Sequence, residues 1–188
     1  MQFVSIRRFI LASITSLFLV PVFAAGLEDE NLLQTLPDGY KIGFQDRQQN
    51  MLLTEMVPEA ETVENWTEMV TTQVFPGLKA TPQQFKATID QSVKAACPGA
   101  ESVDVTQGEE NEYPISIWMQ VCPLNPSTGK PEYTWFKAIQ GNDSFYVVQK
   151  AFRYAPSEEE VVRWMKYFQG VGVCDTRLQA SPCSLAGK

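Results

Sequence analysis

Alternating apolar and polar positions predict a β-hairpin in the first third of the chain. Residues 40–44 read Tyr-Lys-Ile-Gly-Phe, which has the two-residue period of a strand with one buried face. A second strand is expected over 51–57, because Pro58 cannot continue a central hydrogen-bonded ladder. The polar residues 47–50 between these two strands supply the turn. Residues 26–37 are mostly polar and are expected to form a lead-in segment.

Helical periodicity further along the chain predicts three helices. Apolar residues three or four positions apart predict the first helix over 63–75. The second begins at Thr81, which forms a capping box with Gln84, and a proline stands at its first helical position. The third begins at Ser157, which forms another capping box with Glu160.

Between the second and third helices, β-branched and aromatic residues alternate with short polar turns, which indicates an antiparallel meander. The four predicted strands cover 102–106, 113–122, 132–140 and 144–154, and the longest loop is 123–131. The predicted fold class is therefore α+β, with an antiparallel sheet of about six strands flanked by three helices.

The N-terminal residues have the order of a secretory signal peptide. Two arginines precede an apolar run over 9–23, and small residues follow, so that cleavage fits best after Ala24 and nearly as well after Ala25. The run of about fifteen residues is shorter than the roughly 20 that a spanning helix needs, which favours cleavage over an uncleaved anchor. We therefore predict a signal peptide over 1–24. Residues 25–188 are predicted to form one periplasmic or secreted domain without stable membrane insertion.

Charge and composition exclude several classes of function. Without the two N-terminal arginines, 13 basic residues face 22 acidic ones, which gives a net charge of −9. This acidity argues against a nucleic-acid partner, because phosphates require a basic footprint. The chain has no histidine, which excludes Ser-His-Asp and Cys-His catalysis and almost all catalytic zinc sites. No motif indicates a cofactor or a metal, and none is expected.

The four cysteines predict two disulfides. An even number of cysteines in an exported chain is typical of disulfide bonding, and no CxxC motif favours a metal or redox site. Four cysteines allow three pairings. The pairs closest in sequence are favoured, namely Cys97–Cys122 and Cys174–Cys183, the second of which would close a loop in the C-terminal tail.

Aromatic residues on the predicted strands give the candidate binding residues. Aromatic side chains on strands more often pack in a core than line a groove, but tryptophan is enriched at binding hot spots. Trp118 and Trp135 are therefore the first candidates, with Tyr133 beside them. Lys130 lies in the 123–131 loop, which is a second candidate surface.

Other motifs are incomplete, and no catalytic residue is predicted. The Ser-Thr-Gly-Lys run at 127–130 resembles part of a phosphate loop, but Leu124 and Pro131 break the pattern. The acidic loop 108–112 lacks the spacing of an EF-hand. Five glutamates surround the predicted helix at 63–75, where a solvated acidic face is expected instead of a carboxylate pair for acid–base chemistry. They are Glu55, Glu59, Glu61, Glu64 and Glu68.

Several longer runs resemble a family of exported proteins from Gram-negative bacteria for which no activity is established. They are GYKIGFQDRQQNMLLTEMVP, ETVENWTEMVTTQVF, KPEYTWFKAIQGNDSFYVVQKAFRY and VCDTR. The resemblance covers most of the mature chain and includes the four cysteines, and it transfers no catalytic residue. The order of elements is also distantly similar to the Mog1/PsbP-like fold, an antiparallel sheet sandwiched by helices. Known members of that fold are mostly non-enzymatic accessory or binding proteins, which is weak support for function.

Three hypotheses of function follow. The first is a non-enzymatic accessory or binding protein of the bacterial envelope or periplasm, which binds a protein partner or a small ligand through a sheet face or the 123–131 loop. The second is a carboxylate-dependent envelope hydrolase, which requires two acids that converge in a pocket and at least one perturbed pKa. The third is an inhibitor of a foreign hydrolase, which requires a protruding rigid loop.

Overall fold

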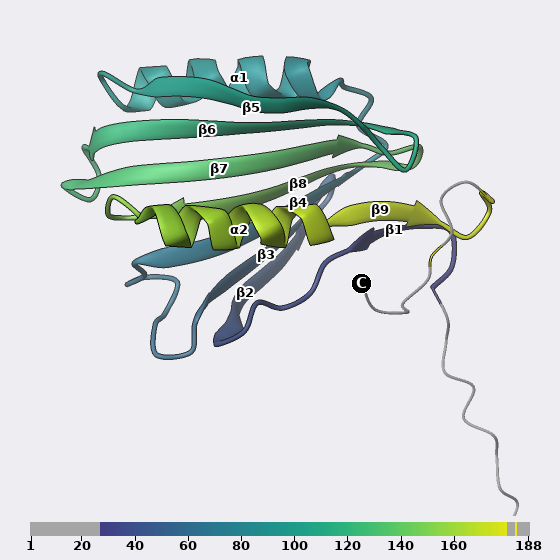
Figure 1. Ribbon diagram of the computed structural model, residues 1–188, viewed down its shortest axis with the longest axis horizontal. Helices are drawn as coiled ribbons and strands as arrows, with labels where there is room; N and C mark the ends of the chain where they lie inside the picture. The colour runs from purple at the N-terminus through teal and green to yellow at the C-terminus, as the bar shows by residue number, and fades with distance from the viewer. Residues whose placement is uncertain (1–26, 180–182, 184–188) are drawn as a thin grey trace, which may run out of the picture.

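The computed structural model describes residues 27–179 and 183, so the predicted signal peptide lies outside the described residues. The chain forms nine strands and two helices within these ranges (Figure 1). In chain order the elements are β1 (Glu30–Leu33), β2 (Tyr40–Gln48), β3 (Met51–Pro58), β4 (Glu68–Pro76), α1 (Pro82–Ala96), β5 (Glu101–Glu110), β6 (Tyr113–Asn125), β7 (Lys130–Gln140), β8 (Ser144–Phe152), α2 (Glu158–Gly170) and β9 (Gly172–Asp175).

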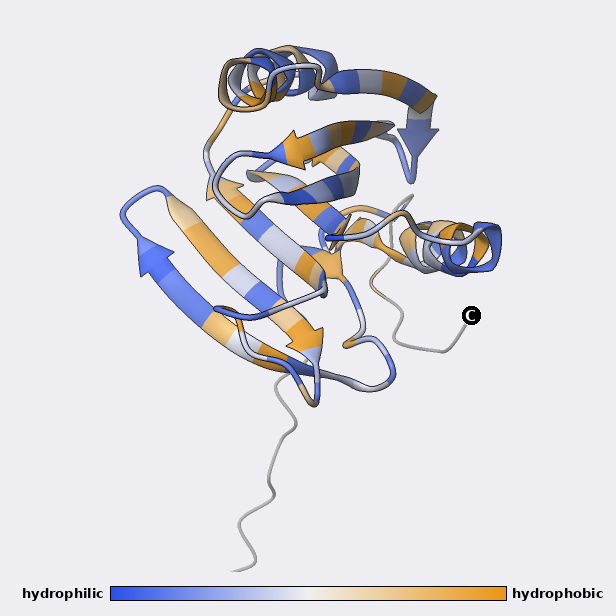
Figure 2. Cartoon of the chain, turned by 90° about the vertical axis from the view of Figure 1, so that its left-hand side faces the viewer, coloured by the Kyte–Doolittle hydropathy of each residue, from blue (hydrophilic) through white to orange (hydrophobic). Residues whose placement is uncertain are grey.

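Seven strands form one antiparallel sheet in the order β2-β3-β4-β8-β7-β6-β5, and β1 pairs with β9 in a separate two-stranded sheet. The two helices lie on opposite faces of the large sheet (Figures 1 and 2). The predicted α+β class with an antiparallel sheet is therefore confirmed, although the sheet has one more strand than expected.

The helix predicted over 63–75 is wrong, because β4 occupies Glu68–Pro76. This strand lies between β3 and β8 and carries apolar residues on both of its faces, which imitates helical spacing. The true period is two: Val70 and Val74 point to the α2 side, and Met69 points to the α1 side. Losing this helix leaves two helices instead of three among the described residues.

The other two helices begin where the capping boxes predict. The Thr81 hydroxyl accepts a hydrogen bond from the backbone N–H of Gln84 at 3.1 Å, and the Gln84 side chain accepts one from the Thr81 N–H at 2.9 Å. Ser157 and Glu160 repeat this arrangement at the start of α2. Both boxes satisfy N–H groups that a helix start leaves without partners.

The 123–131 loop is much shorter than predicted. Strand β6 continues to Asn125 and β7 begins at Lys130, so these strands are joined by a tight turn. The register shifts between Cys122 and Asn125, which lets the ladder continue past Pro123. The connection between the two strands is therefore the turn 126–129 in place of the longer predicted loop.

Two cores lie on the two faces of the sheet. On the α2 side, Trp164 and Phe168 of the helix pack onto apolar residues of β4, β6, β7 and β8. On the α1 side, Phe85 and Ile89 pack onto a smaller cluster around Trp118. No helix among the described residues is long and apolar enough to cross a membrane.

A fully buried lysine fixes the end of α2 over the sheet. The ammonium group of Lys137 on β7 donates to the backbone carbonyls of Phe168 at 2.9 Å and Val171 at 2.7 Å, and it pairs with Glu110. A cation is favourable at a helix C-terminus, where carbonyl groups lack intrahelical partners. Lys137 therefore sets where α2 ends on the sheet.

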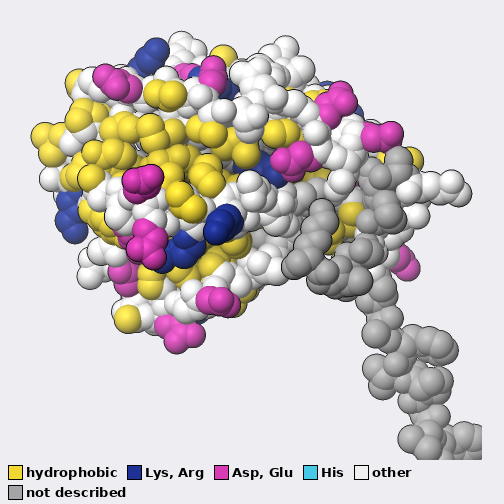
Figure 3. Space-filling model, in the orientation of Figure 1, with side chains coloured by type: hydrophobic (Ala, Val, Ile, Leu, Met, Phe, Trp, Pro, Cys, Tyr) yellow, Lys and Arg dark blue, Asp and Glu magenta, His cyan; other side chains and the backbone are white. Residues whose placement is uncertain are grey.

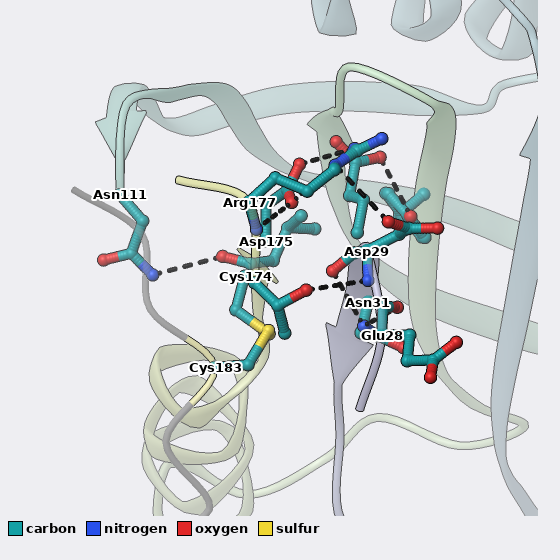
Figure 4. The surroundings of a disulfide bond; sticks show 12 residues. Glu28, Asp29, Asn31, Asn111, Cys174, Asp175, Arg177 and Cys183 are labelled. Atoms are coloured by element: carbon teal, nitrogen blue, oxygen red, sulfur yellow. Dashed lines mark hydrogen bonds and ion pairs between the residues drawn. A yellow bond between two sulfur atoms is a disulfide. The ribbon is translucent and has the colours of Figure 1, made fainter. Parts of the chain in front are cut away.

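Both favoured cysteine pairs are confirmed as disulfides. Cys97 at the end of α1 is bonded to Cys122 on β6, and Cys174 on β9 is bonded to Cys183 in the tail. Figure 4 shows the second bond next to Arg177, whose guanidinium lies 2.6 Å from carboxylate oxygens of both Asp175 and Asp143. These contacts tie the C-terminal end of β9 to the β7–β8 turn.

Glu30 anchors β1 to the same turn. Its carboxylate accepts hydrogen bonds from the backbone N–H groups of Asn142, Asp143 and Ser144 and from the Tyr146 hydroxyl. These bonds hold β1 beside the large sheet and direct the following segment, residues 34–39, alongside α2 (Figure 1). The segment forms one wall of the pocket described next.

Candidate functional site

A pocket of about 560 Å³ opens between α2, the 35–38 segment and the adjoining ends of β2, β3 and β4. This volume lies within the range of small-molecule sites. The lining residues are Thr35, Leu36, Pro37, Asp38, Tyr40, Pro58, Glu68, Arg163, Trp164 and Tyr167. Aromatic, aliphatic and charged groups are thus gathered around one space from five parts of the chain.

Three aromatic rings form one wall of the pocket. Trp164 and Tyr167 are three residues apart on α2 and therefore lie on the same face of the helix. Their ring centroids are 5.2 Å apart, and Tyr40 of β2 meets the other side of Trp164 at 5.5 Å, both in edge-to-face geometry. The Tyr167 hydroxyl also donates to the Thr35 carbonyl at 2.8 Å, which fixes the 34–39 segment to the helix.

The polar side of the pocket is built around the Glu68 carboxylate at the start of β4. It accepts hydrogen bonds from the Lys150 ammonium at 2.7 Å, the Tyr40 hydroxyl at 2.7 Å and the Tyr154 hydroxyl at 2.8 Å. Burial acts to raise the pKa of Glu68, but the hydrogen bonds from Lys150 and the two tyrosines outweigh burial and lower it. Glu68 is therefore a fixed anion at neutral pH.

Lys150 lies behind Glu68, with its side chain fully buried beneath α2. Its ammonium is 4.0 Å from the centroid of Trp164, 4.4 Å from Phe152 and 5.0 Å from Tyr40, so it sits in an aromatic cage. Burial lowers the pKa of Lys150 to about 8, while the ion pair with Glu68 opposes this shift. The lysine supports the pocket from the core side and is not among the residues that line it.

Tyr154 connects Glu68 to a second carboxylate. Its hydroxyl lies 2.8 Å from Glu68 and 2.7 Å from Glu160 at the start of α2. The backbone N–H of Ser157 is the main cause of a lowered pKa at Glu160, and the Tyr154 hydroxyl adds to it. Burial, together with the neighbouring carboxylates, raises the pKa of Tyr154 and also that of Tyr40.

The two carboxylates of this network are held in their charged form. Hydrogen bonds lower the pKa of both Glu68 and Glu160, so each presents hydrogen-bond acceptors. The aromatic wall suits a planar or apolar group, and the fixed carboxylate suits a hydrogen-bond donor. No group of acidic or cysteine side chains within the described ranges could hold a metal ion.

The structure does not bring the predicted binding residues together. Trp118 is 0% exposed and stacks on Phe136 at 4.7 Å on the α1 side, while Trp135 is 6% exposed in the core on the α2 side. Tyr133 is partly buried, and Lys130 is exposed at the start of β7. None of these four residues lines the pocket, and their binding role stays a prediction.

Tyr133 belongs to an apolar surface on the α2 side of the sheet. Figure 3 shows hydrophobic side chains gathered over β6 and β7 beside α2, where Tyr133 and Met119 are partly buried and Val103 on the neighbouring β5 is exposed. None of the hydrogen bonds described above for the pocket involves Tyr133, Met119 or Val103.

Sequence reasoning missed Glu68 and Lys150 for different reasons. Glu68 was grouped with exposed acids because a helix was expected there, whereas β4 turns it toward the α2 side. Lys150 had a usable signal, because it alternates with Tyr146, Val148 and Phe152 on the apolar face of β8. A lysine on such a face is buried and requires a partner.

Comparisons with known proteins do not identify the chain. No known family model matches the sequence, and no curated protein matches it. The Ran-binding protein Mog1p of Saccharomyces cerevisiae, in a crystal structure at 1.9 Å resolution, is similar with a TM-score of 0.42 and 9% sequence identity. The match covers 75% of this chain and 85% of that chain. A similarity of this size supports no conclusion about fold family, partner or activity, so both resemblances stated from the sequence stay predictions.

Proposed function

We propose that this chain is an exported, non-enzymatic binding protein of the bacterial envelope or periplasm, and that it binds a small ligand in the pocket between α2 and residues 35–40. The observation that carries the proposal is one pocket of about 560 Å³ that combines three aromatic rings with a fixed carboxylate. Ligand sites are typically concave and mostly apolar, with a few well-placed polar groups.

The rigidity of the pocket supports this proposal. Glu68 has three donors, and both Tyr40 and Tyr167 have their hydroxyls engaged. The lining groups therefore lose little conformational freedom when a ligand binds, which lowers the entropic cost of association. The ligand expected here has a ring or apolar face for the aromatic wall and an N–H or O–H donor for Glu68.

The export part of the proposal rests on the predicted signal peptide and on the disulfides. Both disulfides are consistent with an oxidising compartment, because such bonds are rare where thiols are kept reduced. Within an envelope or periplasm, a binding protein of this size would meet small molecules that cross the outer layer of the cell.

Native mass spectrometry tests the proposal. The mature protein is incubated with a dialysable extract of Gram-negative envelopes, freed from unbound molecules and measured intact. We expect the wild type to retain one small molecule per chain. We expect Leu36→Trp to lose it, because Leu36 lines the pocket and the larger side chain fills part of the space.

Leu124→Trp is the matched control, since Leu124 is exposed on the β6–β7 hairpin and does not line the pocket. Circular dichroism confirms that both variants fold. A wild type that retains nothing, or a Leu36→Trp variant that retains the molecule as well as the control does, contradicts the proposal.

A further inference from the structure

A second cleft of about 310 Å³ lies on the opposite face of the sheet. Helix α1 packs over β6 and β7 and leaves the neighbouring part of this face, toward β8 and β4, without a helix (Figure 2). Ile89 and Val93 of α1 form one wall of the cleft. Trp66 lies just before β4 and Met69 lies near its start, and together they form the other wall.

The floor of this cleft carries five uncharged polar side chains from four adjacent strands, together with Cys122, Glu132, Phe136 and Ala151. The five polar side chains are Thr71 and Gln73 on β4, Gln149 on β8, Thr134 on β7 and Gln120 on β6. Under α1, apolar residues occupy the neighbouring part of this face, in the cluster around Trp118. The polar groups of the floor require partners, which other protein groups, water or a ligand can supply.

Internal partners account for only part of this floor. Gln149 donates to the Gln73 side-chain carbonyl at 2.8 Å, and Gln120 donates to Asp90 at 2.6 Å. The Thr134 hydroxyl makes no hydrogen bond to another group among residues 27–179 and 183, and it is not one of the fully buried polar atoms that lack a partner, so it is open to water in the cleft. The side chains of Gln149 and Thr71 are partly exposed and are not among those buried atoms either, so they are also open to water. Donors and acceptors thus remain available toward the cleft.

The walls of the cleft are held in place. The Cys97–Cys122 disulfide joins the end of α1 to β6, and Cys122 itself lines the cleft. Asp90 on α1 bonds Gln120 on the floor and also pairs with Lys86 at 2.6 Å. The distance between α1 and the floor is therefore fixed by covalent and polar links.

The charge of the lining defines the ligand class. Glu132 is the one charged residue in the lining, and it already accepts a hydrogen bond from Asn125 at 3.1 Å. No Lys or Arg is among the lining residues, although the Arg153 guanidinium lies 3.7 Å from the centroid of the Trp66 ring. Amides and hydroxyls both donate and accept, which matches hydroxyl groups. The aliphatic side chains of Ile89 and Val93, with the part of Trp66 that Arg153 does not cover, offer apolar surface to the C–H groups of a sugar ring.

We propose that this cleft is a second binding site, separate from the pocket beside α2, and that it takes a neutral saccharide unit. The uncharged polar side chains of the floor hold the sugar hydroxyls, and the Thr134 hydroxyl supplies one of the hydrogen bonds. The proposal does not depend on the ligand of the first pocket, because the two sites lie on opposite faces of the sheet.

Two-dimensional ¹H–¹⁵N NMR tests this site with defined probes. Glucose, mannose, galactose and N-acetylglucosamine are each titrated into the ¹⁵N-labelled mature protein. The four tryptophan indole signals serve as reporters, because Trp66 lines this cleft and Trp164 lines the other pocket. We expect a saturable shift of the Trp66 indole and of the Gln73 and Gln149 side-chain amides with at least one sugar, while the Trp164 indole stays unchanged.

Thr134→Val removes the hydroxyl and keeps the shape of the side chain. We expect it to weaken binding about three- to tenfold, the range of one neutral hydrogen bond. Thr106→Val, at an exposed position of β5, is the matched control and should leave binding unchanged. The proposal is overturned if no sugar gives a saturable shift, if Trp164 moves in place of Trp66, or if both valine variants bind like the wild type.

Discussion

At the scale of single residues, Lys150 is a charged side chain in an apolar environment that normally excludes charge. It is fully buried, and its charge is balanced by Glu68 at 2.7 Å. Removing one partner of a buried ion pair costs more than the pair itself contributes, because the other charge remains without compensation. Lys150 and Glu68 therefore act as one unit, which positions the carboxylate that the pocket presents.

The buried lysine predicts how stability depends on pH. Its pKa is about 8 in the folded chain and near the ordinary 10.5 in the unfolded chain, so the unfolded chain binds more protons between these values. The free energy of unfolding should therefore rise from pH 8 to pH 10, by at most about 1.4 kcal/mol per pH unit from this group. Burial also lowers the pKa of Lys137, which contributes in the same direction.

Urea unfolding of Lys150→Met and of Lys94→Met, followed between pH 8 and pH 10, checks this prediction. Lys94 is exposed on α1, so its variant should keep the wild-type slope. The Lys150→Met variant should show a smaller rise with pH. Equal slopes in the two variants would show that Lys150 does not carry the pH dependence. Above pH 10 the raised pKa of Tyr40 reverses the trend, because the unfolded chain then loses tyrosine protons first.

At the scale of elements, sequence reasoning predicts an element correctly where residues close together in the chain determine it. It fails where strand pairing within the sheet determines the element. Both helices were predicted to the correct start, because the capping boxes at Thr81 and Ser157 are local. Strand β4 was not predicted, because its place in the middle of the sheet depends on pairing with β8, which is distant in sequence. Glu68 lies at the start of β4, so this one error also hid the centre of the candidate site.

Gly141, which follows β7, shows how closely β1 approaches the β7–β8 turn. A Cβ atom at this position would lie 2.7 Å from the Ser144 carbonyl oxygen and 2.7 Å from the carboxyl carbon of Glu30. We expect Gly141→Ala to lower the free energy of unfolding by about 1–3 kcal/mol. Gly108→Ala is the control, since a Cβ there meets nothing within 4 Å, and it should change stability by no more than about 0.5 kcal/mol. Chemical unfolding measures both, and equal losses would refute the close approach.

The two disulfides should contribute unequally. In the chain-entropy description, a bond across 25 residues contributes about 3.5 kcal/mol and one across 9 residues about 2.6 kcal/mol. The double variant Cys97→Ala/Cys122→Ala should therefore unfold at lower denaturant than Cys174→Ala/Cys183→Ala. The first variant should also lose the proposed saccharide site, because α1 is no longer tied to β6. The opposite order of stability would mean that native-state contacts at the tail outweigh loop entropy.

At the scale of the whole molecule, one sheet presents two different chemistries on its two faces. The α2 face has an aromatic pocket with a fixed carboxylate, and the α1 face has an uncharged polar cleft. Composition and charge predicted a binding protein in general terms, since the lack of histidine excludes histidine-based catalysis and the acidity argues against a nucleic-acid partner. They could not locate either site, because each gathers residues from segments that are brought together only by the order of strands in the sheet.

Export is the prediction that belongs to the complete chain. Expression with the native N-terminus in a Gram-negative host should yield a periplasmic product that begins at Ala25 or Gly26. N-terminal sequencing and cell fractionation measure this directly. A product that keeps residues 1–24 and stays with the membrane fraction would favour the uncleaved anchor.

The most direct test of the central claim is whether the Trp164 indole senses ligands in the pocket beside α2. Indole, phenol and benzamide are titrated into the ¹⁵N-labelled mature protein, because each offers a ring for the aromatic wall and a donor for Glu68. The account predicts a saturable shift of the Trp164 indole signal that Leu36→Trp weakens, with the core indoles of Trp118 and Trp135 unchanged. If none of the three probes shifts Trp164, or if Leu36→Trp responds like the wild type, the pocket is not the binding site.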